Sequence, residues 1–359
     1  MAFALISALV SATAAVDSSS PEGRSLDWLG QVTIAVGLFA VLYSVIQGPT
    51  DGWRSWPVTA GFIVGAVFLM LFVVAERRSE APLLRLDFFH NRNFAVASIV
   101  TVIGMFAFLG VAYSTSIRLS AIQGFSPLKT SIAFLCLNGM ALIQLPLTIR
   151  LLRRYTARWP LSAGLILMAA GALWMASVPA SHLSLVPVIP AFIAVGMGFG
   201  LALSALSMVV VSTPPTHLAG MASGTTNMLR DFGFTLGPAV IGAVALSQAA
   251  DQIQQRLAAS PALRHEMANF VKIAASAPAP QKAALEGAVH AVQSGPLGAN
   301  AVPASINPLK SVAFDALGHS YALGFVLSGV AALVAAALTI VGMRARTDDT
   351  LLDLELLDD

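Results

Sequence analysis

The 359-residue chain is 57% hydrophobic and only 11% charged, with a formal net charge of +2 and a mean hydropathy of +0.78. Soluble domains carry roughly 25% charged residues, so the composition excludes a soluble globular protein. The small net charge argues against a nucleic-acid partner, which would require a strongly basic surface. We therefore expect an all-α integral membrane protein embedded in a lipid bilayer, because helices satisfy their own backbone polar groups within lipid.

Apolar runs interrupted by Gly, Pro and charges predict about eight full transmembrane helices after an N-terminal stub at residues 1–16. No Asp, Glu, Lys or Arg occurs between Arg158 and Arg230, a run long enough for about three crossings of ~20 residues each. Tryptophans stand at the ends of several runs, where amphipathic rings favour the headgroup region. The expected spans are 29–47, 56–75, 93–116, 129–149, 160–179, 185–211, 218–247 and 319–343.

The stub at 1–16 admits two interpretations. It has the apolar core of a signal peptide and small residues at 12–14, but it lacks the basic n-region of such peptides. Cleavage there would also reverse the orientation of every later helix. We therefore favour a partial helix, the remnant of a preceding bundle.

Arginine asymmetry predicts the orientation of the chain. If successive connections alternate sides, one side receives eleven arginines and the other three cations, with the long connection at 248–318 left out. The positive-inside rule places the richer side and the C-terminus in the cytoplasm, and the Ala-rich composition suggests a bacterial inner membrane. The eleven are Arg24, Arg77, Arg78, Arg85, Arg92, Arg150, Arg153, Arg154, Arg158, Arg344 and Arg346; the three are Arg54, Arg118 and Lys129.

Two polar segments flank the last span. Segment 248–318 has helical propensity, weak amphipathicity and several prolines, so we expect a mobile extracytoplasmic hairpin on the membrane surface. A partner-docking site is the alternative. The tail at 344–359 is acidic and contains several leucines, and we expect it to form a frayed cytoplasmic helix.

Four segments carry a family resemblance: "ERRSEAPLLRLDFFHNRNF" from residue 76, "IQGFSPLKTSIAFL" from 122, "LPLTIRLLRRYTARWPLSAG" from 145 and "MASGTTNMLRDFGFTLGPAVIGAV" from 221. In this order they resemble the fourteen-helix drug:proton antiporter branch of the major facilitator superfamily. The resemblance implies an inserted helix pair at 29–76 and a complete second six-helix bundle at 93–343. It makes 1–16 the remnant of helix six and leaves the family's first five helices without a counterpart.

The seventh span contains a glycine pattern. Gly224, Gly233, Gly237, Pro238 and Gly242 resemble the antiporter motif of the family's helix five, with the last glycine displaced by one position. Small residues four apart let two helix backbones approach, and proline permits a bend. The last four of these residues are therefore candidates for gating, with ordinary helix packing as the alternative.

Arg230 and Asp231 stand side by side in this otherwise uncharged span. If the span ends near Gln248, the pair lies about 27 Å from the outer end, at the cytoplasmic boundary where Arg can snorkel. Neighbours point about 100° apart on a helix, so the two need not pair. Both are candidates for gating or coupling, with anchoring of the helix end as the alternative. Asp231 is the only acid of the spans not plainly in a loop, which makes it the candidate for proton coupling.

Substrate contacts are expected from polar side chains within the spans, which favour a wet cavity over lipid. Asn138, Gln144 and Asn227 meet this description, and Phe106 and Met140 add adaptable apolar surface. The alternatives are helix-to-helix hydrogen bonding for the amides and ordinary packing for the other two. The sequence has no nucleophile-base-acid set, phosphate loop or metal-spaced cluster, so we expect neither an enzyme nor a metal or other cofactor.

Together these features predict a transporter that exports small amphipathic or drug-like compounds with the proton gradient as its energy source. Alternating access needs two bundles around one site, and the expected architecture supplies one. Transport is therefore expected to require a partner chain that carries the missing N-terminal helices, or self-association. The alternative is a non-transporting membrane scaffold or assembly subunit.

Overall fold

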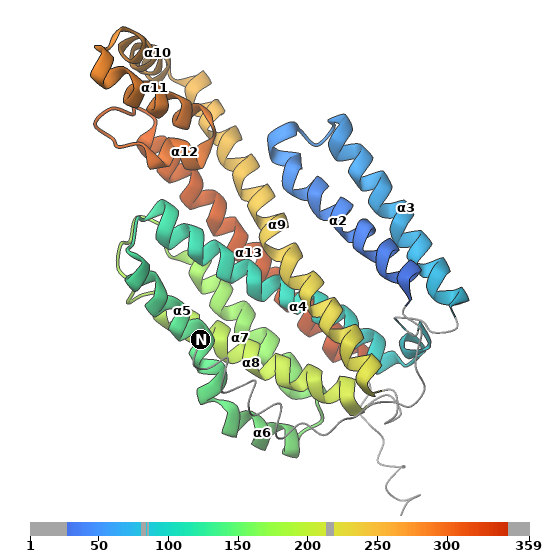
Figure 1. The fold of residues 1–359 in the computed structure, drawn as a ribbon. Helices are drawn as coiled ribbons and strands as arrows, with labels where there is room; N and C mark the ends of the chain where they lie inside the picture. The colour runs from blue at the N-terminus through green and yellow to red at the C-terminus, as the bar shows by residue number, and fades with distance from the viewer. Residues whose placement is uncertain (1–26, 80–83, 85, 213–218, 344–359) are drawn as a thin grey trace, which may run out of the picture.

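The computed structural model describes residues 27–79, 84, 86–212 and 219–343, so the stub at 1–16 and the tail at 344–359 lie outside the described residues. Within these ranges the regular structure is helical, without a strand (Figure 1). The helices are α2 (Trp28–Asp51), α3 (Trp56–Arg78), the 3-10 helix η1 (Leu86–His90), α4 (Arg92–Ser116), the π-helix η2 (Ile117–Ile122), α5 (Pro127–Ile143), α6 (Leu145–Arg154), α7 (Arg158–Ser177), α8 (Ile189–Ser212), α9 (Ala219–Ala259), α10 (Pro261–Ser276), α11 (Ala279–Gln293), α12 (Pro296–Ala301) and α13 (Lys310–Gly342).

Seven helices of the described chain are long and apolar enough to cross a membrane, or eight if the bent pair α5 and α6 forms one span. This confirms the all-α membrane architecture of about eight crossings. The last two spans are longer than expected, because α9 continues to Ala259 and α13 begins at Lys310.

The expected span 129–149 is not one straight helix, since α5 and α6 meet at a bend of 45° beside Gln144. Pro146 lies in the first turn of α6. Proline has no N–H, and its ring clashes with the carbonyl four residues earlier, so a straight helix through this point is unfavourable. A new helix therefore starts at Leu145.

The bundle has its centre between α4, α7, α8 and α13, with α9 packed on α4 and α13, and α5 packed on α8. Small residues bring the helices together: a Cβ on Gly164 of α7 would lie 2.6 Å from the Gly198 carbonyl oxygen of α8. Close backbone approach of this kind is how membrane helices pack, since lipid offers no hydrophobic drive. The buried side chains include Met105, Leu161, Leu165, Met168, Phe192 and Phe325.

α2 and α3 form a hairpin beside the bundle and contact it mainly through α9 (Figure 1). Large apolar side chains such as Phe39 and Met70 are exposed on this hairpin, as expected for helices that face lipid. Its extent matches the expected pair at 29–76, whose role as an insertion stays a prediction.

The two ends of the bundle differ in charge, and only one of them is covered by additional helices in the described part of the chain. At the basic end lie the end of α3, the start of α4 and the turn between α6 and α7, and α10, α11 and α12 lie at the cap end (Figure 1). These three segments of the basic end contain Arg77, Arg78, Arg92 and the arginines at 150–158. Which end faces the cytoplasm stays a prediction.

The expectation of a mobile hairpin at 248–318 is wrong, because this segment is a compact helical cap. α9 extends into it, α10 to α12 follow, and α13 starts within it. Phe270, Val292 and Leu317 belong to one buried cluster with Ile122 of η2. Arg256 of α9 also pairs with Asp315 of α13 at 3.4 Å.

The prolines of the cap explain the error. Pro261, Pro280 and Pro296 each lie in the first turn of a helix, where the missing N–H has no intrahelical partner to lose. They therefore start helices instead of interrupting them, and the alanines between them favour the helical state.

The expected spans place Arg118 in an outer loop, but it lies in η2, which continues α4. Its buried guanidinium donates to the carbonyl oxygens of Met175 at 3.0 Å and Pro179 at 2.9 Å. The Gln123 side-chain amide adds bonds to the carbonyls of Ala180 at 2.7 Å and His182 at 3.0 Å. These contacts tie the cap end of α4 to the end of α7.

Candidate functional site

α9 presents two different faces, because residues about 3.6 apart share a side of a helix. Gly233 and Gly237 face α4. A Cβ on Gly233 would lie 2.5 Å from the Val102 carbonyl oxygen, and one on Gly237 would lie 2.7 Å from that of Phe106. The two glycines thus permit backbone contact, which supports the packing interpretation; their gating role stays a prediction.

The second face of α9 is polar and open. Asn227, Asp231 and Thr235 follow one another at four-residue intervals, and all three are exposed. The Asp231 side chain is 72% exposed. Pro238 and Gly242 continue this face towards the cap end. The predicted coupling and gating residues are therefore divided between two sides of one helix.

Asp231 lies farther from the basic end than expected. Because α9 continues past Gln248 to Ala259, the distance to its end does not give the depth of Asp231. The depth follows instead from how α9 packs on α4. Gly233 packs on Val102, which lies about 15 Å along the axis of α4 from Arg92 at a rise of 1.5 Å per residue. Asp231 is roughly 3 Å lower, which places it near the middle of a ~30 Å hydrocarbon layer if that layer begins at the level of Arg92.

The neighbouring charges are close to each other. Arg230 Nε lies 3.8 Å from Asp231 Oδ1, and the Arg230 side chain is 34% exposed. This distance is at the limit for an ion pair, and exposed pairs stabilise a fold only weakly. The contact therefore leaves the Asp231 carboxylate available to other groups.

A pocket of about 510 Å³ lies between α2, α4 and α9, where the open face continues towards the cap. Small-molecule sites span about 300–1,000 Å³ and are mostly apolar with a few polar groups. Here Thr50, Tyr113 and Thr235 supply hydroxyls, and the predicted gating residues Pro238 and Gly242 line the wall. The remaining lining residues are Ile46, Pro49, Leu109, Phe234, Ala239, Ala243 and Leu246.

An aromatic cluster joins three helices next to this pocket. The rings of Phe108 on α4 and Phe199 on α8 stack at 3.6 Å between centroids, and Phe234 of α9 lies 6.4 and 6.3 Å from them. Phe234 also lines the pocket. Sequence analysis missed Phe199 and Phe234, because their meeting depends on the register of three helices far apart in sequence.

The predicted substrate residues of α5 lie elsewhere. Gln144 is buried, and its amide donates to the Met197 carbonyl of α8 at 2.6 Å, which supports the alternative of helix-to-helix bonding. Asn138 is exposed and donates to the Phe134 carbonyl of its own helix at 3.0 Å. Met140 is half-buried on the same helix.

The structure therefore does not assemble the predicted substrate residues into one site. Asn138, Gln144 and Met140 belong to the α5 side of the bundle, whereas Asn227 lies on α9, which packs on α4 (Figure 1). Phe106 is half-buried on α4 beneath Gly237 and is not among the residues lining the pocket.

Asp231 is not the only acid within the helices. Glu76 lies inside the last turn of α3, is buried, and accepts a hydrogen bond from the Leu84 N–H at 3.1 Å. The sequence placed it in the connector after a span ending at residue 75. Because α3 runs three residues further than expected, Glu76 becomes a further candidate for proton coupling.

Comparison with known proteins identifies relatives. A family model described as the Major Facilitator Superfamily matches residues 1–238. The multidrug resistance protein Stp of Mycobacterium tuberculosis is 31% identical over 258 residues, covering 71% of this chain and 48% of that protein. The tetracenomycin C resistance and export protein of Streptomyces glaucescens is 28% identical over 348 residues, covering 96% of this chain and 61% of that protein.

Two further matches extend the series. The probable actinorhodin transporter of Streptomyces coelicolor is 26% identical and is covered over 40% of its length. A solved structure of a bacterial homologue of the human lysosomal transporter Spinster, inward-facing and unoccupied, has a TM-score of 0.45 and 13% identity, covering 88% of this chain and 71% of that one. The chain spans about half the length of the sequence relatives it matches.

Proposed function

The chain belongs to the major facilitator superfamily, and on that premise we propose that it takes part in proton-driven export of small amphipathic compounds. Its family and named relatives are membrane transporters, not enzymes. The chain is an integral membrane protein. The proposal places it in a bacterial inner membrane with its basic end in the cytoplasm.

The observation that carries the proposal is the open polar face of α9. A carboxylate exposed near the middle of a bundle is unfavourable against lipid, so such residues line wet cavities or face other protein. Asn227, Asp231 and Thr235 form a polar path that ends at the pocket between α2, α4 and α9. We propose that the amphipathic substrate moves along this path.

The apolar pocket and the aromatic cluster favour a loosely selective site. Phe234 belongs to both, and aromatic rings accept many apolar shapes through stacking and edge contacts. The relatives named for resistance to or export of drugs and antibiotics agree with this substrate class. In the proposal, Asp231 carries the coupling proton, and the proton gradient is the energy source without any other cofactor.

Transport also needs an opposite wall, since alternating access rocks two bundles around one site. We propose that a second six-helix bundle covers the open face of α9. It would come from additional helices or from a partner chain.

Dye efflux tests the proposed function. Membrane vesicles would contain the 359-residue chain alone, or together with the part of the Streptomyces glaucescens relative that this chain does not match. We expect loss of a fluorescent amphipathic dye that depends on a pH gradient in the paired sample, and no loss after a protonophore collapses the gradient. If the rate of dye loss does not depend on the pH gradient in either sample, although the chain is correctly inserted, the result would exclude transport and favour a membrane scaffold.

A further inference from the structure

The turn between α6 and α7 concentrates positive charge. Arg150, Arg153 and Arg154 are exposed, and Arg158 is half-buried. None of the four forms an ion pair within the described part of the chain. The sequence has no Asp or Glu at any position between Asp87 and Asp231, so the helices around this turn contain no acid that could neutralise it.

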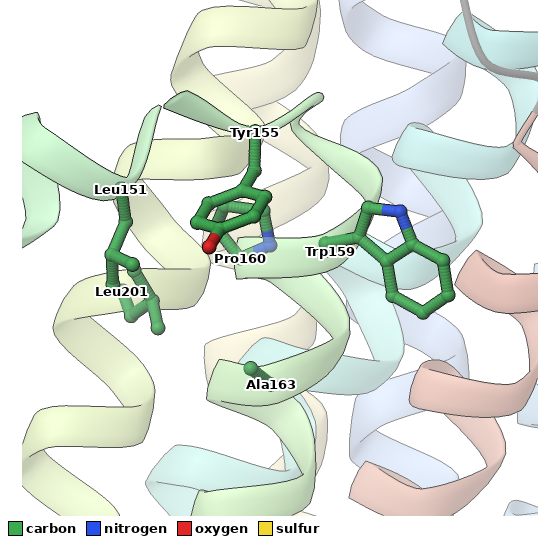
Figure 2. Close-up of a pocket in the computed structure, with 6 residues that line it drawn as sticks. All are labelled: Leu151, Tyr155, Trp159, Pro160, Ala163 and Leu201. Carbon is green, nitrogen blue, oxygen red and sulfur yellow. The ribbon is translucent and has the colours of Figure 1, made fainter. Parts of the chain in front are cut away.

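An apolar pocket opens directly beside this turn (Figure 2). It has a volume of about 370 Å³ and is lined by residues of α6, α7 and α8. Tyr155 and Trp159 are among its lining residues and are 52% and 55% exposed, and Ala163 lies one turn further along α7. The pocket thus leads from two aromatic rings of the type found at the headgroup level into the apolar part of the bundle. The lining residues are Leu151, Tyr155, Trp159, Pro160, Ala163 and Leu201.

The guanidinium of Arg158 lies next to Trp159, one of the residues that line this pocket. It sits 5.2 Å from the centroid of the Trp159 ring. Its Nε is buried and has no hydrogen-bond acceptor among the described residues. Arginine forks bind phosphate oxygens through paired N–H groups, so a phosphate beside Arg158 would supply the missing acceptor.

α6 itself has the form of a helix that lies in a membrane interface. At 100° per residue, Arg150, Arg153 and Arg154 fall on one side, whereas Leu151 turns towards the pocket. Helices with arginine on one side and apolar residues on the other bind at the boundary between headgroups and acyl chains, and they favour anionic lipids. The bend of 45° after α5 gives α6 its own direction there.

We propose that the notch between α6, α7 and α8 binds an anionic phospholipid from the adjacent leaflet. One acyl chain occupies the pocket from Trp159 towards Ala163, and the phosphate binds Arg158 and the other arginines of the turn. The apolar lining favours a lipid over a free anion, and the arginines, which form no ion pair with the described residues, favour an anionic headgroup over a zwitterionic one. The site shares no lining residue with the pocket between α2, α4 and α9, so it is independent of the proposed substrate path.

Native mass spectrometry of the full chain tests the proposal, with phosphatidylglycerol and phosphatidylcholine of identical acyl chains offered at equal concentration. We expect preferential retention of phosphatidylglycerol. Arg153→Gln combined with Arg154→Gln should weaken that retention roughly tenfold, since each cation near a headgroup contributes to binding. Ala163→Phe should reduce it similarly by filling the pocket at an exposed position.

Matched controls separate the site from general lipid adhesion. Arg264→Gln with Lys272→Gln removes two exposed cations of α10 at the cap end, and Ala66→Phe adds a ring to the exposed face of α3. Both should leave retention unchanged, and gel filtration would show whether each variant is folded. Equal retention of the two lipids, unchanged retention in Ala163→Phe, or complete displacement by free glycerol phosphate would each overturn the proposal.

Discussion

Gly237 of α9 lies against the carbonyl oxygen of Phe106 on α4, so close that a Cβ would come within 2.7 Å of it. Gly237→Ala should therefore separate the helices and lower the free energy of unfolding by roughly 1–3 kcal/mol, as overpacking does. The thermal unfolding midpoint of the purified chain in detergent measures this. Gly224→Ala is the matched control on the same helix, because nothing lies within 4 Å of a Cβ there. Equal midpoints for the two variants would contradict the contact.

Arg118→Lys tests the link between η2 and α7. The guanidinium reaches the carbonyls of Met175 and Pro179 with two different nitrogens, whereas an ammonium presents donors from a single atom. Since bonds to charged groups contribute roughly 1.5–3 kcal/mol each, the unfolding midpoint should fall clearly. Arg54→Lys, at an exposed position, should not change it. A stable Arg118→Lys protein would show that the two bonds do not hold the helices together.

Thr235→Phe tests the pocket between α2, α4 and α9. Thr235 is exposed and lines the pocket, so the larger side chain should occupy the cavity with little effect on folding. In the dye assay we expect a severalfold loss of transport rate at normal expression. Ser207→Phe places the same ring on an exposed position of α8 that does not line this pocket, and it should transport as the unmodified chain does. Equal rates for both variants would remove the pocket from the substrate path.

Asp231→Asn tests proton coupling. The amide resembles the protonated acid and cannot release a proton, so dye should still move down its own gradient, but a pH gradient should no longer drive accumulation. Asp251→Asn, an exposed acid on the cap part of the same helix, should retain full coupling. Glu76→Gln provides the discriminating comparison: loss of coupling there, with coupling intact in Asp231→Asn, would assign the proton to the buried carboxylate of α3.

The membrane helices could be predicted because apolar length must match the bilayer, and charge-free runs record that requirement directly. The bend at Gln144 has a visible cause in Pro146, although the apolar run on both sides of it predicts one continuous span. The cap was missed because its helices are rich in alanine and only weakly amphipathic, and their burial depends on meeting η2 and α13. In such an alanine-rich sequence, burial against distant segments produces little periodicity of apolar residues from which the helices could be predicted.

The residues of the candidate site could be predicted only in part, because their meeting also depends on contacts between distant segments. Asn227, Asp231 and Pro238 could be singled out as unusual residues in an apolar span. Of these, Pro238 lines the pocket between α2, α4 and α9. The contacts of Gln144 with α8 and the stacking of Phe108 on Phe199 depend on how helices are set against one another. No rule based on spacing within one helix contains that information.

The 41 residues of α9 form one continuous helix from the basic end into the cap, about 60 Å long at 1.5 Å per residue. Because one helix carries both Asp231 and the start of the cap, we expect a movement of α9 to displace the cap as well. A fluorescent label on α10 would therefore report rearrangements that occur around Asp231.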